Sequence, residues 1–444
     1  MTKSPGAAPP ESRPMQCARA PRHRARQRGA ATLAVSLVLL FAMLMTAAYA
    51  HRSLLLEQRL SANQYREAQA FEAAQSGIDW AVAQLNQARP VNERCEPVAL
   101  AASRSFRERF LASDTASGRH EPRRWDSGSQ SLALQPACLR TAGAWSCACP
   151  SSGFPQFPAT AADDNTPRPA FSVQFSAEPL PGLVRLTATG CSNAAGPCRP
   201  GHDSRADAVV RLQVLLALLP GVSVLPQAAL TVRESVDAGD AALGLHNADA
   251  ASGGVSVHAG GSLIGTALRL STTPGSPAQA SASTHDAALA ALTPDWLFAA
   301  QFGLDRASWR RHGAVQQLDC SFACGARLAA AIDATGSNRM ISINGDAALD
   351  GPLTLGSPQQ PVVIVVDGAA VLSGDVTVHG LLYAASIRWD AATGPQASVH
   401  GAVVSESGYA GNGAPDLHRD AGVLRALQVH TGSFAQVPGS WKDF

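Results

Sequence analysis

The residues best suited to do chemistry in this 444-residue chain are its cysteines. Eight of the nine follow a long apolar segment near the N-terminus, and Cys17 alone precedes it. The eight are Cys95, Cys138, Cys147, Cys149, Cys191, Cys198, Cys320 and Cys324. An even number on one side of such a segment fits disulfides formed in an oxidising compartment. We therefore treat all eight as disulfide candidates.

Spacing resolves the pairing only in part. Cys191 and Cys198 flank a turn and are natural partners, whereas Cys138 fits either Cys147 or Cys149. Free thiols and a metal site are alternatives to disulfides. Metal is the weaker one, because no histidine stands at finger-like spacing near the close cysteine pairs. We predict no metal site and no cofactor.

Histidines and acidic corners recur in the C-terminal half. His258, His379 and His400 stand in similar β-rich contexts, where stacking would create a metal or proton-transfer site. We favour outward corners satisfied by solvent or backbone, since no acidic residues share their spacing. Aspartates beside glycines recur at Asp240, Asp346, Asp350, Asp367 and Asp375. They lack the fixed spacing of Ca²⁺-binding nonapeptides, so turns explain them better than calcium does.

Catalytic motifs do not occur in the sequence. We find no GxSxG, HExxH or Walker A pattern, and we predict a protein without catalytic residues. Charged residues make up 16% of the chain and the net charge is +1, which argues against nucleic acid as a partner. A carbohydrate-active enzyme is a third hypothesis behind the two stated below.

An apolar segment from Gly29 to Ala50 must organise the chain. It has 22 residues without a charge, enough for roughly 30 Å of helix, the thickness of one bilayer core. A leader of residues 1–29, rich in arginine and expected to be disordered, precedes it and should stay in the cytoplasm. A secretory signal cleaved after Ala48-Tyr49-Ala50 is the alternative.

Helical periodicity continues beyond the apolar segment. Apolar residues recur at Leu56, Leu60, Ala68, Phe71, Ala74, Ile78, Ala81 and Leu85. No proline interrupts the pattern before Pro90. We predict one transmembrane and amphipathic assembly helix over residues 30–88, with its second half packed on a soluble domain.

The junction Arg26-Gln-Arg-Gly29-Ala30 before the apolar run resembles the class III leader of type IV pilins and of type II secretion pseudopilins. The resemblance implies cleavage by a prepilin peptidase between Gly29 and Ala30, and methylation of the new N-terminus. The stretch Ala70–Ile78 is similar to the PilX-type minor pilin pattern, with Gln75-Ser76 in place of Glu-Ala. The glutamate that major pilins carry at position five is replaced by Ala34, which suits a terminal or priming subunit.

Residues 89–220 change to short alternating runs. Phe171–Phe175, Leu183–Thr189 and Asp207–Leu219 predict strands, and Ala112–Gln130 predicts a loop. By resemblance, this region is a pilin-like antiparallel β domain with disulfides, resting on the long helix.

Residues 221–444 have a different texture, with short β runs ended by glycine, asparagine or aspartate. Their spacing is irregular, and stacked coils of a β-solenoid explain it best. A helix is expected at Pro294–Phe302, and the C-terminal runs Leu424–Leu427 and Val437–Phe444 are expected to cap the coils.

The expected protein is α+β: an N-terminal helix, a pilin-like β domain and a β-solenoid-like region. We predict a non-enzymatic minor pilin-like subunit for type IV pilus assembly, acting in priming or at the tip. Its partners would be other pilin subunits, a prepilin peptidase and the inner membrane, with the C-terminal bulk in the periplasm and later on the pilus or cell surface. The alternative is a membrane-tethered, adhesin-like β-solenoid outside any fibre.

Overall fold

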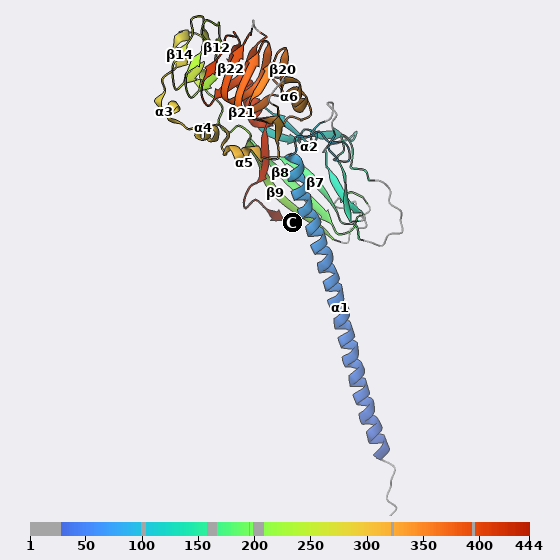
Figure 1. The fold of residues 1–444 in the computed structure, drawn as a ribbon. Coiled ribbons are helices and arrows are strands. Elements are labelled where there is room, and N and C mark those ends of the chain that lie inside the picture. The colour runs from blue at the N-terminus through green and yellow to red at the C-terminus, as the bar shows by residue number, and fades with distance from the viewer. Residues whose placement is uncertain are drawn as a thin grey trace, which may run out of the picture. The chain divides into compact units, whose positions relative to one another are not determined.

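The computed structural model describes residues 28–98, 104–141, 143–157, 167–194, 196–198, 208–320, 324–392 and 396–444. One long helix, α1 (Arg28–Leu85), precedes a region made mostly of strands (Figure 1). The chain divides into two compact units, one up to Gln64 and one from Tyr65 to Phe444. The architecture is α+β, as predicted.

An antiparallel sheet forms the first part of the second unit. Its strands follow the order β26-β9-β8-β7-β5-β6, and β27 also pairs with β9. Their bounds are β5 Ala137–Thr141, β6 Ala144–Ala148, β7 Ala170–Ala177, β8 Leu183–Cys191, β9 Val209–Pro220, β26 Gly432–Gln436 and β27 Lys442–Asp443. The predicted strands at 171–175, 183–189 and 207–219 correspond to β7, β8 and β9.

Short elements fill the segment between α1 and this sheet. Helix α2 (Phe106–Phe110) begins with a capping box in which Ser105 and Glu108 satisfy each other's backbone amides. Two hairpins follow, β1 (Leu111–Asp114) with β2 (Arg119–Pro122), and β3 (Arg124–Asp126) with β4 (Ser131–Ala133). The prediction of a loop over 112–130 is therefore wrong, because short polar strands lack the apolar alternation that marks half-buried ones.

The second sheet has 16 strands, and each of its described pairs is parallel. Strands in the first half are β10 Leu230–Val232, β11 Val236–Asp237, β12 Gly244–His246, β13 Val257–Ala259, β14 Leu263–Ile264, β15 Arg269–Ser271 and β16 Ala282–Ser283. Those in the second half are β17 Val315–Asp319, β18 Met340–Asn344, β19 Ala347–Asp350, β20 Leu353–Leu355, β21 Val362–Ser373, β22 Val376–Asp390, β23 Ser398–Ser405, β24 Tyr409–Ala410 and β25 Asp416–Arg419.

Strand pairing arranges these segments as successive coils. One face reads β17-β18-β21-β22-β23-β10-β13-β16, a second β19-β21-β22-β24-β11-β14 and a third β20-β22-β23-β25-β12-β15. Buried aliphatic side chains such as Ile341, Ile343, Ile364 and Val366 fill the interior. Parallel strands buried in this way need no polar alternation, which accounts for runs such as Val362–Val366.

The order of coils in space differs from their order in sequence. The first coil in sequence, residues 230–246, stacks on the last, residues 398–419, through β10 on β23 and β12 on β25. We call this contact the seam. The coils after residue 246 continue away from the seam to β16, whereas those from β17 onward approach it from the other side.

Helices cover the coils at two places. Helices α3 (Ala287–Ala291), α4 (Pro294–Phe302), α5 (Arg306–Arg310) and α7 (Ala421–His430) pack with outward side chains of β18, β21, β22 and β23 in one apolar cluster. Helix α4 has the predicted bounds. Helix α6 (Cys324–Asp333) contributes Leu328 and Ile332 to the coil interior where β19 and β20 each have a single strand partner. Two 3₁₀ turns, Ala250–Ser252 and Ala278–Ser281, complete the fold.

The C-terminal tail does not cap the coils, contrary to the prediction. It leaves α7 and pairs β26 and β27 antiparallel to β9, so that Phe434 lies opposite Leu218. Phe434 is fully buried and belongs to the core shared by α1 and the antiparallel sheet. Sequence alone gave no sign of this return, because strand partners more than 200 residues apart leave no local pattern.

Arg107 of α2 holds the returning tail against the end of α1. Its side chain is fully buried, and its three nitrogens donate to the carbonyl oxygens of Leu85, His430 and Gly432 at 3.2, 3.0 and 2.8 Å. The guanidinium also lies over the ring of Phe434, 4.9 Å from its centroid. Burial lowers the Arg107 pKa to about 10, which leaves the group charged at neutral pH.

Two asparagines add backbone hydrogen bonds at the same place. Asn86, just after α1, receives the Phe434 amide at 2.7 Å and donates to the Phe434 carbonyl at 3.0 Å. Asn338 makes the equivalent pair with Gly432, at 3.0 and 2.8 Å. We call Asn86, Arg107, Asn338 and the tail residues Gly432–Phe434 the joint, because they connect α1, the antiparallel sheet and the coils.

Substituting Arg107 with methionine should destabilise the second unit strongly. The change leaves three buried carbonyl oxygens without their donor, and an unsatisfied buried acceptor costs about 1–3 kcal/mol. Chemical denaturation of the detergent-solubilised protein, followed by tryptophan fluorescence, measures the loss. Arg124→Met, at an exposed arginine, is the matched control and should change stability little. Equal stability of the two variants would contradict this role for Arg107.

Acid should weaken the joint through His120. The ring is fully buried edge-on to Phe434, and burial, with the charge of Arg107 and His430 nearby, lowers its pKa from 6.5 to about 4. Between pH 6.5 and 4, His120 is therefore protonated in the unfolded chain but neutral in the folded chain. Above pH 6.5, titration of His120 does not change the free energy of unfolding. This free energy falls by about 3 kcal/mol as the pH drops to 4.

Denaturation midpoints measured between pH 7 and 4 test this prediction. His120→Gln should flatten the acid loss, although His312 and His430, whose pKa values burial also lowers, keep part of it. The same substitution at exposed His285 is the control and should leave the profile unchanged. An unaltered pH profile for His120→Gln would show that His120 does not carry the effect.

Candidate functional site

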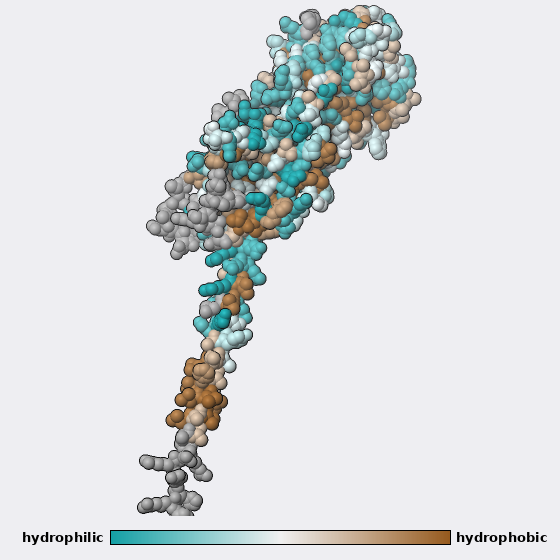
Figure 2. Space-filling view, turned by 180° about the vertical axis from the view of Figure 1, so that it is seen from behind, coloured by the Kyte–Doolittle hydropathy of each residue, from teal (hydrophilic) through white to brown (hydrophobic). Residues whose placement is uncertain are grey.

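The N-terminal half of α1 exposes its apolar side chains all round. The large apolar side chains from Leu33 to Met45 are each more than half exposed, and Figure 2 shows them gathered along the helix. Among the described residues, α1 is the helix long and apolar enough to cross a membrane. A helix without a polar face is stable in lipid or against other apolar helices.

The second half of α1 is packed on the antiparallel sheet by its small residues. Gly190 of β8 faces this helix so closely that a Cβ there would lie 2.1 Å from the Ala70 carbonyl oxygen and 2.4 Å from the Ala74 nitrogen. Ala70 and Ala74 are fully buried. Backbone contact of this kind requires glycine on the strand and small residues on the helix.

Aromatic side chains complete the same contact. Gly77 of α1 lies against Phe171 of β7, where a Cβ would come within 3.0 Å of the ring. Trp80 packs between Phe106 and Phe171, with centroid distances of 5.3 and 5.6 Å. The buried positions Ala74, Ile78, Ala81 and Leu85 follow the predicted stripe, whereas Leu56, Leu60 and Ala68 are exposed.

The expected cleavage residues Gly29 and Ala30 lie in the first turn of α1. The leader up to residue 27, including Cys17, lies outside the described residues. Ala34, four residues after Ala30, is exposed on the apolar part of the helix.

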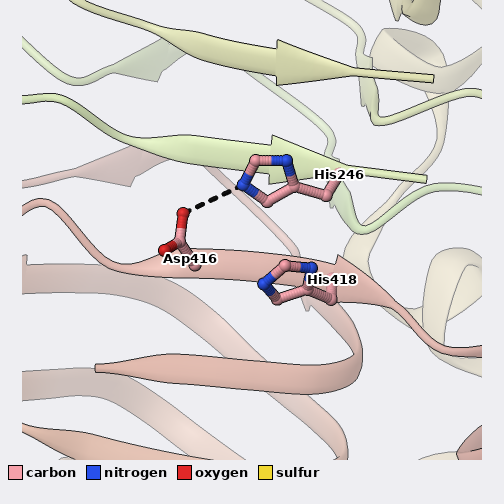
Figure 3. A group of neighbouring side chains, drawn as sticks. All are labelled: His246, Asp416 and His418. Carbon is pink, nitrogen blue, oxygen red and sulfur yellow. Dashed lines mark hydrogen bonds and ion pairs between the residues drawn. The ribbon is translucent and has the colours of Figure 1, made fainter. Parts of the chain in front are cut away.

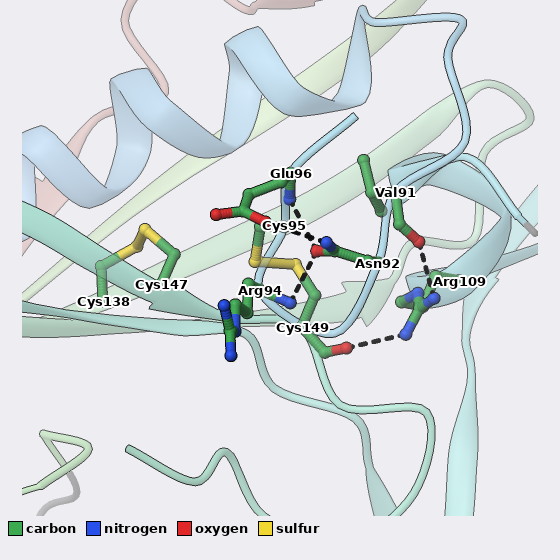
Figure 4. The surroundings of a disulfide bond; sticks show 9 residues. All are labelled: Val91, Asn92, Arg94, Cys95, Glu96, Arg109, Cys138, Cys147 and Cys149. Carbon is green, nitrogen blue, oxygen red and sulfur yellow. Dashed lines mark hydrogen bonds between the residues drawn. A yellow bond between two sulfur atoms is a disulfide. The ribbon is translucent and has the colours of Figure 1, made fainter. Parts of the chain in front are cut away.

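The eight cysteines of the second unit form four disulfides. The pairs are Cys95–Cys149, Cys138–Cys147, Cys191–Cys198 and Cys320–Cys324 (Figure 4 shows the first two). Of the two possible partners of Cys138, the structure pairs it with Cys147, which stands directly opposite it in the register of β5 and β6. Cys95–Cys149 closes a separation of 54 residues and so ties the end of α1 to the sheet.

Hydrogen bonds of Arg109 and Asn92 hold the backbone around the Cys95–Cys149 bond. Arg109 donates to the carbonyl oxygens of Cys149 and Val91, each at 2.8 Å, and fixes both sides of the bridge (Figure 4). Asn92 receives the backbone amides of Arg94 and Glu96, which closes the turn around Cys95. These contacts support the chain where it leaves the helix.

Histidines of four neighbouring parallel strands stack in one column. His379, His400, His418 and His246 occupy aligned positions on β22, β23, β25 and β12, and neighbouring rings are 5.0, 5.1 and 4.5 Å apart. The three ring contacts place imidazole beside imidazole along the parallel register. We favoured outward corners over stacking for His258, His379 and His400; His379 and His400 do stack, whereas His258 lies outside this column.

Acidic residues contact His258, contrary to the expectation for the three predicted histidines, and also His246 of the column. His258 contacts Asp286 through Nε2 at 2.7 Å, and His246 contacts Asp416 through Nε2 at 2.9 Å. Figure 3 shows His246, Asp416 and His418 drawn together across the seam. The spacing Gly244-Leu-His246 and Asp416-Leu-His418 was the available signal, but its meaning depends on which coils are neighbours.

The acidic corners serve mainly in turns and ion pairs. Asp367 pairs with Arg306 at 3.3 Å and Arg310 at 2.9 Å, and Asp346 receives the Ala369 amide at 2.8 Å.

The N-terminal segment matches a model of a protein family. Residues 28–79 match the family model described as PilX N-terminal, which confirms the resemblance predicted for this segment. This match lies within the N-terminal helix α1. Comparisons of the chain with curated proteins and with solved structures gave no match.

Replacing Gly190 with alanine should loosen α1 from the sheet. The added methyl group cannot fit beside the Ala70 and Ala74 backbone, so helix and strand must separate, at about 2–3 kcal/mol for such overpacking. Denaturation and limited proteolysis near residue 85 measure the effect. Gly313→Ala is the control, since a Cβ there meets nothing within 4 Å. Wild-type stability and protease resistance in Gly190→Ala would contradict the close packing.

Proposed function

We propose that this protein is a minor pilin-like subunit that acts in the priming or at the tip of a type IV pilus. The PilX N-terminal match over residues 28–79 carries the proposal. Its helix has two environments, an exposed apolar half and a half packed on a folded domain. This division suits a subunit stored in a membrane and later packed among helices of the same kind.

The processing step follows from the same segment. A prepilin peptidase would cleave between Gly29 and Ala30, and the basic leader would hold the uncut protein with its N-terminus in the cytoplasm. The C-terminal bulk would then lie in the periplasm, where four disulfides form. Ala34 in place of a glutamate favours a terminal position, because no carboxylate is available there to pair with a neighbour's free amine.

The folded part divides by role in this proposal. Residues 30–88 form the assembly helix, and residues 89–220 form a pilin-like domain that the C-terminal tail completes. The rest of residues 221–444 forms a β-solenoid that is presented outward. Parallel coils with a filled interior support the solenoid, and the helix packed across an antiparallel sheet supports the pilin-like domain. The solenoid would contact other subunits or a surface. An adhesin-like tethered protein is the alternative if no fibre forms.

Sequencing of the mature N-terminus tests the proposal. In cells with an active prepilin peptidase, mass spectrometry should find a chain beginning at N-methylated Ala30. Gly29→Val should leave the precursor uncut, since the peptidase cuts after glycine, while Gly6→Val, the same change elsewhere in the leader, should be processed normally. A chain starting near His51 would identify a secretory signal, and an intact Met1 in wild type would refute the proposal.

A further inference from the structure

The seam brings three possible metal ligands together from segments about 170 residues apart. Asp416 and His418 are two residues apart on β25 and so point to the same side of the strand. His246 of β12 lies directly opposite His418 in the parallel register. One donor atom of each residue lies within 4.8 Å of the other two.

Gly244 makes room for the carboxylate. It lies opposite Asp416 in the register, and a Cβ at this position would fall 1.9 Å from Asp416 Oδ1 and 2.6 Å from His246 Nε2. Any other residue would occupy the space in which carboxylate and imidazole meet. The glycine therefore shapes a small polar pocket between β12 and β25.

The outer partner of His246 orients its ring. Ser271 of β15 lies opposite His246 in the register and contacts Nδ1 at 2.8 Å, which leaves Nε2 facing Asp416. Metal-binding histidines usually have such a hydrogen bond on the second nitrogen. His418 is half-buried beside the imidazoles of His246 and His400.

Arg269 currently balances the negative charge. Its Nη2 lies 2.9 Å from Asp416 Oδ1 and its Nη1 3.3 Å from Oδ2. The arginine is 45% exposed and also donates to the carbonyl oxygens of Ala242 at 2.9 Å and Ala414 at 3.3 Å. Metal binding would displace its contacts with the Asp416 carboxylate.

We propose that His246, Asp416 and His418 bind one divalent transition-metal ion of the Zn²⁺ type across the seam. Two imidazoles and one carboxylate suit Zn²⁺, Ni²⁺ or Cu²⁺ and not Ca²⁺, which takes six to eight oxygens. Zinc bonds of about 2.0–2.2 Å bring ligand atoms to roughly 3.3 Å from each other, a closure that small side-chain rotations supply. The metal would clamp the first coil in sequence to the last, and the proposal is independent of the pilus assignment.

Calorimetric titration of the full chain with Zn²⁺ tests the site, in detergent and on a Cys17→Ser background that removes the cysteine outside the described disulfides. We expect saturable binding of one Zn²⁺ and no comparable binding of Ca²⁺. His418→Ala and Asp416→Asn should each weaken binding at least tenfold. His258→Ala is the matched control, since His258 also pairs with an aspartate but belongs to no group of three possible ligands among the described residues, and should bind as wild type does.

Arg269→Gln separates a metal site from a hydrogen-bonded network. Removing the competing guanidinium should tighten Zn²⁺ binding several-fold, whereas a purely structural network would gain nothing from the change. Zn²⁺ should also raise the melting temperature of wild type and of His258→Ala but not that of His418→Ala. A cooperative melting transition of His418→Ala that Zn²⁺ does not shift shows that the variant is folded and lacks the site. The absence of saturable Zn²⁺ binding by wild type, or equal affinity in His418→Ala, overturns the proposal.

Discussion

The contact on which the second unit depends is the buried guanidinium of Arg107. Three backbone carbonyls converge on it, one from the end of α1 and two from the segment that leads into β26. A buried charge is tolerated only where hydrogen bonds replace its water, and here they come from chain segments more than 300 residues apart. The helix end, the antiparallel sheet and the coils are consequently joined by a single side chain and the two asparagines beside it.

This connection explains how one helix can serve two environments. The exposed half of α1 has no polar face and requires an apolar surrounding, so it contributes little to the folded unit itself. Ala70, Ala74 and Gly77 provide the close backbone packing that attaches the other half. The small residues that resemble the minor pilin pattern therefore have a direct packing role in this chain.

Local patterns in the sequence predicted the local parts of this structure. The periodicity up to Leu85, the alternation in β7 and β8, and the helix at Pro294–Phe302 each follow from neighbours along the chain. The tail strand, the seam and the histidine column did not follow, because they depend on partners hundreds of residues away. His246 was overlooked for this reason, while His258 was grouped with residues it does not meet. Spacing likewise left the partner of Cys138 open until the register of β5 and β6 was known.

The seam also constrains how the chain is made. Residues 230–283 leave the ribosome long before residues 398–419, on which the first of their coils stacks. Until then β10, β11 and β12 present an unpaired parallel edge, a surface open to wrong pairing. The first coil can therefore complete its pairing only after residues 398–419 have been made, and a protein that stops before them would lack the platform for its earliest strands.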